Sequence, residues 1–318
     1  MSHDQFSLIS NQAVALCGIA YFLALLAHLA EWTSGRAVPV QAAEASQAAA
    51  AGSVDTLERV EVNTARTQRF ARLGLVLTVV AAGVHLVAVV SRGLAADPIR
   101  VPWGNMYEFT LTATLVVTLG YLLLYRRYGL SWLSPIVTAF VVITLMVDVL
   151  LLYTPVVPLR DALQSPWLVI HVVAAIIATG AFTLGGMCSA LYLVKEWRQR
   201  AGGVKPGGYL SRLPDLAGLD RMAYRTQAFA FPVWTFAALI AGPIWAQHAW
   251  GRYWGWDPKE VWAFITWVVY AAYLHARATA GWKGRAAAIV ALIGLATLWF
   301  NFVGINFFFG SGSQHSYA

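Results

Sequence analysis

Residues 131–153 read SWLSPIVTAFVVITLMVDVLLLY and contain one charged side chain, that of Asp148. A helix of this length rises by about 35 Å and can cross the hydrocarbon core of a bilayer, which is about 30 Å thick. Similar apolar runs recur at residues 10–31, 72–92, 106–125, 167–194, 226–247, 261–280 and 286–308. The pattern predicts an all-α fold, a polytopic transmembrane helical bundle of about eight spans.

The composition points the same way and excludes a large soluble domain. Of the 318 residues, 59% are hydrophobic and 12% are charged, whereas soluble domains carry about 25% charged residues. The two cysteines, Cys17 and Cys188, lie in apolar runs without CxxC spacing. We therefore expect them to be packing residues, and not a redox pair or a covalent haem attachment site.

The distribution of Lys and Arg predicts the orientation of the spans. Placing the N-terminus outside puts 17 basic residues on inner segments and five on outer segments, which is the bias that the positive-inside rule describes. Both termini are therefore predicted on the outer side of the membrane. This topology also explains the net charge of +7, so we expect membrane lipid, and no nucleic acid, as a partner.

The first inner connection contains an alanine- and serine-rich stretch at residues 41–52, which predicts a flexible cytoplasmic linker. We divide the chain into residues 1–71, the first span with this linker, and residues 72–318, a membrane domain. The most informative part of that domain is its predicted outer loop, residues 242–267.

The loop reads GPIWAQHAWGRYWGWDPKEVWAFITW and holds six of the chain's 14 tryptophans. An aromatic belt would spread tryptophans over all helix ends, but here they concentrate in one loop. Gly251 and Gly255 allow tight turns or close approach to a ligand. Asp257, Pro258 and Glu260 match the N-cap, first residue and capping box of a helix start. The loop favours a rigid aromatic shelf for a planar ligand of porphyrin size, with an aromatic belt as the alternative.

Residues 250–267, WGRYWGWDPKEVWAFITW, closely resemble the tryptophan-rich WWD signature of the haem-handling protein superfamily. That superfamily includes the CcsA (ResC) proteins of System II cytochrome c biogenesis and the CcmC and CcmF proteins of System I. The length and number of spans are similar to CcsA, as are the segments at 102–108, 163–171, 273–275 and 314–317. The resemblance covers residues 100–318 well and the N-terminal part loosely.

This resemblance implies haem delivery and covalent attachment to the CxxCH segment of apocytochrome c on the outer face, with a CcsB (ResB) membrane protein as partner. The chain would be the haem-handling subunit of a cytochrome c synthase (haem lyase) and would hold haem b without a covalent bond. The implied location is a bacterial inner or plasma membrane, or a thylakoid membrane in a plastid or cyanobacterium. Since no nucleophile or general base is evident in the loop, we expect the protein to act by positioning.

The predicted topology sorts the histidines by depth. His171 and His315 lie on the outer side, and the resemblance implies that they bind haem iron axially, one on each face. His275 lies roughly 20 Å below the outer surface, where an ionisable residue is a functional candidate by default. The resemblance makes His275 the ligand of an intramembrane haem site that the partner completes. His28, also at inner depth, is a further candidate for that site.

Arg100, just before the span at 106–125, is a candidate partner for a haem propionate, and the other residues expected to contact haem lie in the loop. Arg252 would pair with a haem propionate or else reach a lipid headgroup. His248 is a rival for an outer ligand position, whereas His28 and His85 could simply form helix–helix hydrogen bonds. The full set of expected loop contacts is Trp250, Gly251, Arg252, Trp254, Gly255, Trp256, Asp257 and Trp262.

Two other functions fit parts of the pattern. A haem translocator or chaperone without synthase activity, similar to CcmC, would share the loop and histidines but is disfavoured by length and span number. A b-haem or quinone electron-transfer subunit would place histidine pairs on facing helices at matched depths, whereas these histidines lie mostly at span ends and in tails. A transporter is disfavoured because the spans lack paired charges and broken helices.

Overall fold

The computed structural model of the chain describes residues 2–34, 54–158, 163–205, 208–309 and 313–314. Throughout these ranges the regular structure is helical and no strand occurs. The all-α prediction is therefore confirmed. The chain forms two compact units.

Unit 1 contains the N-terminal helices and a short helix from later in the chain. Residues 1–102, 107–156 and 203–213 belong to it. Its elements are α1 (His3–Ser34), α3 (Val54–Leu94), α4 (Met106–Tyr128), η1 (Leu130–Leu133), α5 (Ser134–Val147), η2 (Asp148–Leu152) and α7 (Tyr209–Arg212). Helix α3 begins at Val54, well before the predicted residue 72, so the expected boundary at residue 71 falls inside a helix.

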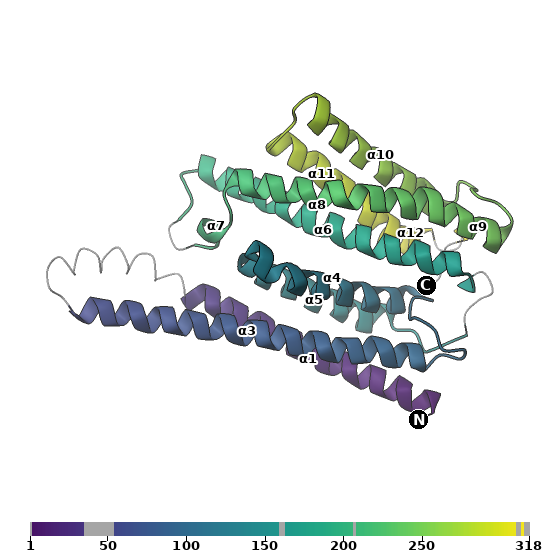
Figure 1. Cartoon of the computed structure of the whole chain (residues 1–318), viewed down its shortest axis with the longest axis horizontal. Coiled ribbons are helices and arrows are strands. Elements are labelled where there is room, and N and C mark those ends of the chain that lie inside the picture. Colours follow the sequence, from purple (N-terminus) through teal and green to yellow (C-terminus); the bar gives the residue numbers. More distant parts are fainter. Residues whose placement is uncertain (1, 35–53, 159–162, 206–207, 310–312, 315–318) are drawn as a thin grey trace. The chain divides into compact units, whose positions relative to one another are not determined.

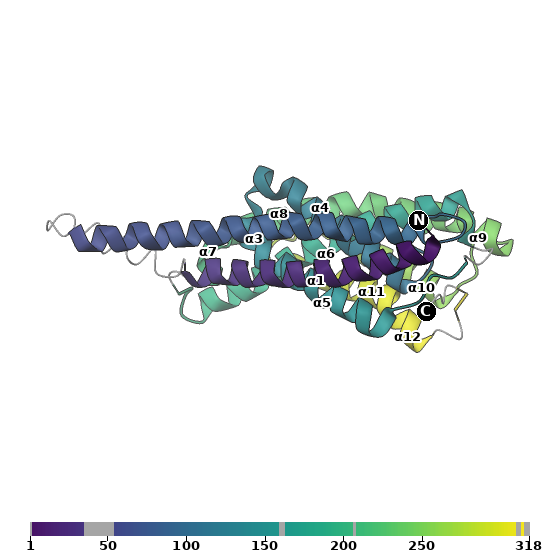
Figure 2. The same ribbon diagram turned by 90° about the horizontal axis from the view of Figure 1, so that it is seen from below.

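Helices α1 and α3 lie side by side along their length (Figures 1 and 2). Small buried residues, such as Ala13, Cys17 and Ala24 on α1, line the packed face. Small side chains let membrane helices approach closely, since lipid provides no hydrophobic force between them. Cys17 and Cys188 are both free and buried, in agreement with the expected packing role.

Unit 2 contains the remaining helices and the tryptophan-rich loop. Residues 103–106, 157–202 and 214–318 belong to it. Its elements are α6 (Pro166–Arg200), α8 (Leu216–Phe236), η4 (Ala237–Ala241), α9 (Gly242–Trp250), α10 (Pro258–Thr279), α11 (Arg285–Trp299), η5 (Phe300–Gly304) and α12 (Ile305–Phe308). Helices α6 and α8 run side by side (Figures 1 and 2).

The core of unit 2 is built on aromatic stacking between helices. The rings of Phe182 on α6 and Tyr270 on α10 stack with centroids 3.7 Å apart and 15° between their planes. Gly294 on α11 makes room for Tyr270, because a Cβ there would lie 2.9 Å from the tyrosine ring. These contacts hold α6, α10 and α11 together and support the loop at the head of α10.

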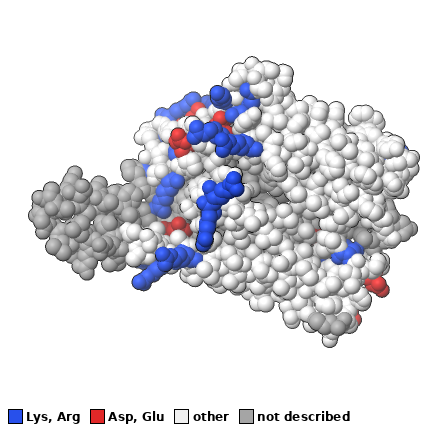
Figure 3. All heavy atoms as spheres, in the orientation of Figure 1, with Lys and Arg blue, Asp and Glu red and all other residues white. Residues whose placement is uncertain are grey.

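Within the described residues, seven helical segments are long and apolar enough to cross a membrane. They correspond to seven of the eight predicted spans. The eighth prediction, residues 261–280, falls in α10, which is helical but less apolar. Large hydrophobic side chains such as Leu123, Leu150 and Leu151 are exposed, and much of the visible surface carries no charge (Figure 3). The chain is an integral membrane protein.

Candidate functional site

The tryptophan-rich loop ends at a helix start that its own side chains build. Asp257 is the N-cap of α10, Pro258 is the first helical residue, and Asp257 Oδ1 accepts from the Lys259 N–H at 3.0 Å. Glu260 Oε2 accepts from the backbone N–H of Asp257 at 3.0 Å and of Gly255 at 2.8 Å. The predicted capping box is confirmed. It fixes the last residues of the loop to the first turn of α10.

Asp257 also holds part of the C-terminal tail. Its Oδ1 accepts from the Ser313 hydroxyl at 2.8 Å, and its Oδ2 accepts from the Gln314 backbone N–H at 2.7 Å. Arg252 Nη2 donates to the side-chain oxygen of Gln314 at 2.6 Å. We call these four residues, Arg252, Asp257, Ser313 and Gln314, the tail clamp. The next residue, His315, lies outside the described residues.

His171, near the start of α6, has one ring nitrogen fixed by the protein. Its Nδ1 lies 2.9 Å from the carbonyl oxygen of Ala237. A carbonyl can only accept, so in the neutral ring Nδ1 carries the proton and Nε2 carries the lone pair. Metal-binding histidines commonly donate their other N–H to a carbonyl in this way. His171 is therefore oriented as an iron ligand would be.

The sequence Gly242-Pro243 explains how His171 reaches this carbonyl. Segment η4 is π-helical, and Ala237 O accepts from the Gly242 N–H five residues later. Pro243 has no N–H for the preceding turn, and the widened turn leaves the second lone pair of Ala237 O for the histidine. A Cβ on Gly242 would lie 3.1 Å from Ala237 O and 3.2 Å from Nδ1 of His171, so a larger residue here would force one of these groups to shift by a few tenths of an ångström.

A row of rings leads from His171 to the loop. The centroids of His171 and Trp245 are 5.8 Å apart with planes at 20°, and those of Trp245 and Trp250 are 4.9 Å apart at 61°. Trp254 and Trp256 meet edge to face, at 5.8 Å and 85°. The loop rings thus form edge-to-face pairs, where the sequence suggested one flat shelf.

Trp256 combines an exposed ring with an unusual backbone. Its side chain is 68% exposed. Its backbone φ is 57°, the one positive φ of a non-glycine residue among the described residues. Such a conformation costs about 1–3 kcal/mol and persists where the surroundings enforce it. Glu260 provides that enforcement, because it bonds the backbone N–H on both sides of Trp256. The arrangement presents the Trp256 ring outward.

The side chain of Arg252 lies directly over Gly255. A Cβ on Gly255 would lie 2.2 Å from Cζ of Arg252, so the guanidinium group occupies the space over this glycine. The sequence left Gly255 as a tight turn or a point of close approach to a ligand, and Arg252 as a partner of a haem propionate or of a lipid headgroup. In the structure Arg252 bonds Gln314.

Lys259 stands at the head of α10 beside Asp257. Its Nζ donates to the side-chain oxygen of Asn306 on α12 at 3.3 Å. Burial lowers the pKa of Lys259 to about 8, against the opposing effect of the Asp257 carboxylate. The link joins the base of the loop to the last turn of the final span.

His275 lies on an exposed face of α10, and no hydrogen bond joins its ring to another described residue. Two residues later, Arg277 donates to both carboxylate oxygens of Asp220, at 2.7 and 3.0 Å. Asp220 also accepts from the Gly284 N–H at 3.1 Å. The pair ties α8, α10 and the start of α11 together and leaves the His275 ring facing outward.

Three other histidines that the sequence singled out have protein partners in the structure. His85 is fully buried, with Nε2 2.9 Å from Leu111 O and Nδ1 3.4 Å from the Tyr21 hydroxyl. His28 lies 3.3 Å from Glu31 and belongs to unit 1, whereas His275 belongs to unit 2. His248 is exposed, and its Nδ1 lies 2.7 Å from Ile244 O in its own helix. Helix–helix or intrahelical bonding therefore describes all three.

Sequence reasoning missed the residues that support the site indirectly. Trp245 was counted among the loop tryptophans, but its contact with His171 had no local signal. Ser313 and Gln314 likewise gave no sign of a bond to Asp257, since some 56 residues separate them. Only Gly242-Pro243 carried a usable signal, because this dipeptide commonly marks an irregular backbone.

Comparison with known proteins places this arrangement in context. Residues 103–311 match the family model described as "Cytochrome C assembly protein". The chain is 35% identical over 227 residues to the cytochrome c biogenesis protein CcsA of Chlamydomonas reinhardtii, and the match covers 68% of the chain and 61% of that relative. It is also 35% identical to CcsA of Guillardia theta, over 68% of the chain and 76% of the relative. CcsA of Prochlorococcus marinus is 34% identical, over 68% and 75%.

Among solved structures, the chain is similar in fold to the cytochrome c haem lyase CcmF. The TM-score is 0.60 at 18% sequence identity. The match covers 96% of this chain and 49% of that one. At this identity the similarity concerns the fold alone.

Proposed function

The chain belongs to the cytochrome c assembly protein family as a CcsA-type cytochrome c biogenesis protein, and from that premise we propose that it presents haem to apocytochrome c for covalent attachment. Haem is the substrate in this proposal, and His171 and His315 bind its iron on opposite faces. The loop contacts are Trp250, Gly251, Arg252, Trp254, Gly255, Trp256, Asp257 and Trp262.

One observation carries the proposal: the His171 ring is pre-oriented beside the tryptophan-rich loop. Its Nδ1 is bonded to Ala237 O, so in the neutral ring Nε2 carries the lone pair that iron coordination would use. The ring of Trp245 stacks beside it, which restricts the imidazole plane. A fixed ligand orientation lowers the entropy cost of binding haem.

The tail clamp supports the second ligand. It ties Ser313 and Gln314 to the loop, and His315 is the next residue in the chain. Because one residue spans at most about 3.6 Å, we propose that the clamp brings His315 within reach of haem bound at the loop. We propose that closing the tail over bound haem delivers the second imidazole.

The chemistry proposed for this site needs no protein nucleophile. Each CxxCH thiol of the apocytochrome adds across one haem vinyl group, so that a C–S bond and a C–H bond replace the S–H bond and the C=C π bond. No oxidant is consumed, and the thiols must arrive reduced. The loop residues orient the substrate and exclude water, which is how positioning lowers a barrier. The family name haem lyase, carried by the CcmF relative, describes the same class of reaction.

The exposed His275 ring is proposed as the ligand of an inner haem site. A CcsB-type membrane protein would cover this face of α10 and supply the second ligand. Haem b would be held there without a covalent bond before moving to the loop. The membrane is proposed to be a bacterial inner membrane, or a thylakoid membrane, with both termini on the outer side.

The test is the haem spectrum of the full chain purified with and without a co-expressed CcsB-type partner. The variants are His171→Ala, His315→Ala and His275→Ala, and the matched control is His248→Ala, near the loop but bonded within its own helix. We expect a low-spin b-type spectrum in the unmutated chain and in the control. The two outer variants should lose outer haem and recover it with added imidazole, while His275→Ala should lose haem more broadly. Absence of haem from the unmutated chain under both conditions would refute the proposal.

A further inference from the structure

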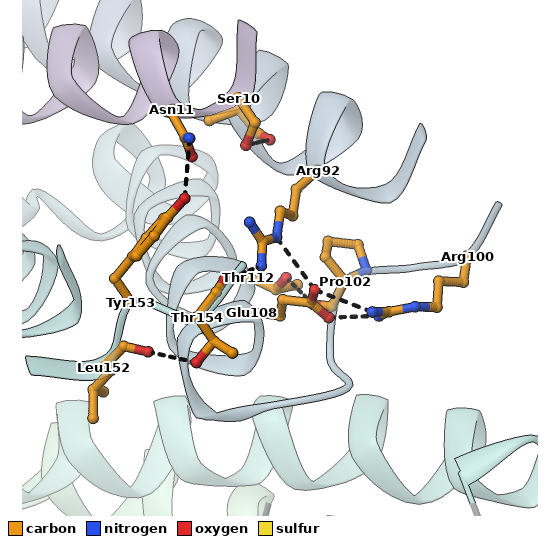
Figure 4. A network of polar contacts seen from close by, with 11 residues as sticks. Ser10, Asn11, Arg92, Arg100, Pro102, Glu108, Thr112, Leu152, Tyr153 and Thr154 are labelled. Carbon is orange, nitrogen blue, oxygen red and sulfur yellow. Dashed lines mark hydrogen bonds and ion pairs between the residues drawn. The ribbon is translucent and has the colours of Figure 1, made fainter. Parts of the chain in front are cut away.

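A buried ion-pair cluster in unit 1 plays no part in the proposed haem site. Arg92 in the last turn of α3 donates through Nε to Glu108 Oε1 at 3.2 Å. Arg100, between α3 and α4, donates to both carboxylate oxygens of Glu108 (Figure 4). Glu108 is fully buried, and three N–H donors stabilise its charge.

A second carboxyl group in the same unit has the opposite environment. Asp148, the first residue of the π-helical segment η2, is also fully buried. Neither of its carboxyl oxygens has a hydrogen-bond partner among the described residues, and the same is true of Nη1 of Arg92. Arg92 and Tyr107 lie within electrostatic range of Asp148. Buried polar atoms without partners are rare in native proteins and call for an explanation.

Neither charge state of Asp148 is fully satisfied. An ionised carboxylate buried without hydrogen-bond donors is costly. A neutral carboxylic acid, however, leaves the two arginines facing only Glu108, so that the buried cluster carries a net charge of +1. Ionisation of Asp148 brings that net charge to zero. Opposing costs of this kind let a group change its protonation state with small changes in its surroundings.

Two further features point to a function. Asp148 lies in a predicted membrane span, where an ionisable residue is expensive and marks a functional site by default. It also begins a π-helical turn, an irregularity that often accompanies functional sites. The arginine contacts extend to the end of this turn, because Arg92 Nη2 donates to Thr154 O (Figure 4).

We propose that Asp148 is a proton-binding site of unit 1, at which a carboxylic acid and a carboxylate exchange one proton with water. The reaction is dissociation of the O–H bond: the electron pair stays on the carboxylate, the proton passes to water, and the positive charge of Arg92 offsets the new negative charge. The other titratable and charged groups around the site are Arg92 on α3, Tyr107 and Glu108 on α4, Arg100 before α4, Tyr153 after η2 and Cys17 on α1.

The experiment uses N,N′-dicyclohexylcarbodiimide, an apolar reagent that converts protonated carboxyl groups into a stable N-acylurea. The full chain in detergent is treated across the pH range in which it stays folded, and adducts are located by mass spectrometry. We expect an adduct on Asp148 that declines as pH rises. Glu108, equally buried but ion-paired, is the internal control and should remain unlabelled. Asp148→Asn should fold and lose the adduct.

An infrared difference spectrum keeps the test decisive if the reagent fails to reach the site. A carbonyl band of a protonated carboxylic acid should titrate in the unmutated chain and be absent in Asp148→Asn. Presence of this band supports the proposal even without an adduct. Absence of both the band and the adduct, or equal labelling of Glu108, overturns it. Neither readout requires bound haem, so the result is independent of the proposed function.

Discussion

Replacing Asp257 with asparagine separates the two structural roles of this residue. Asp257 caps α10 through the Lys259 N–H, and it binds the tail through the Ser313 hydroxyl and the Gln314 N–H. Asparagine caps helices about as well as aspartate, so α10 should keep its start. With its amide oxygen kept on the Lys259 N–H and the Ser313 hydroxyl, however, asparagine turns an NH2 group toward the Gln314 N–H, and that tail bond is lost.

The magnitude follows from the bond that disappears. A hydrogen bond to a charged group contributes about 1.5–3 kcal/mol. A difference of 1.36 kcal/mol changes an equilibrium tenfold, so the ratio of released to bound tail should rise roughly 10- to 150-fold. If the tail delivers His315 to haem, the apparent affinity of the outer site should fall by a similar factor.

The assay needs one readout that is independent of haem. A nitroxide attached at Ala318→Cys reports tail mobility, because the native thiols of Cys17 and Cys188 are buried. Asp257→Asn should raise the label's mobility in haem-free protein and lower haem retention in loaded protein. The matched control is Asp215→Asn, which alters the N-cap of α8 at its Gly218 N–H bond and should change neither.

Two results would refute the reasoning in different ways. Unchanged label mobility in Asp257→Asn would mean that the tail clamp does not hold the tail. Raised mobility with unchanged haem retention would mean that the clamp forms but has no part in haem binding. The helical circular dichroism signal should stay constant in all variants, so that a folding defect is not mistaken for tail release.

Three further predictions follow from single contacts. Gly242→Ala places a Cβ 3.2 Å from the His171 ring. Overpacking of this kind costs about 1–3 kcal/mol, so this variant should retain less outer haem. The control is Gly120→Ala, which has open space around it and should retain haem normally. Asp220→Asn removes the negative charge of the largely buried ion pair with Arg277. The free energy of unfolding should fall by up to about 3–5 kcal/mol. This loss should appear as a lower melting temperature, while the outer-haem spectrum is retained. The pKa of Lys259 is about 8 in the folded chain and near 10.4 in the unfolded chain, so the unfolded state binds more protons between these two pH values. The stability of the unmutated chain should therefore rise with pH across this window, relative to that of Lys259→Met. Parallel pH profiles of the two proteins in thermal melts would contradict the lowered pKa.

The sequence predicted well those features that depend on neighbouring residues. The apolar run at 131–153 and its seven counterparts identified the helices, because a span must satisfy all its backbone groups internally whatever surrounds it. The Asp257-Pro258-x-Glu260 pattern identified the start of α10 for a similar reason, since a capping box closes within four residues. The early start of α3 at Val54 was missed because the polar residues there gave no apolar signal.

The ring geometry and the side-chain partners at the candidate site could be predicted less well from the sequence. Aromatic content predicted stacking surfaces, but whether rings lie flat or edge to face depends on which helices bring them together. The bond from Arg252 to Gln314 could not be read from the sequence, because 62 residues separate the two. His85 was left open, and its two ring contacts come from α1 and α4. These outcomes depend on residues far apart in the chain.

Contiguous residues are enough to identify this chain as a helical membrane protein with a tryptophan-rich loop. They are also enough to assign it to the cytochrome c assembly protein family. Only the tertiary structure decided that Ala237 orients His171, that Asp257 holds Ser313 and Gln314, and that Asp148 is buried without a donor. The physical reason is that a hydrogen bond or its absence is fixed by which elements pack together, and apolar periodicity specifies the helices but not their neighbours.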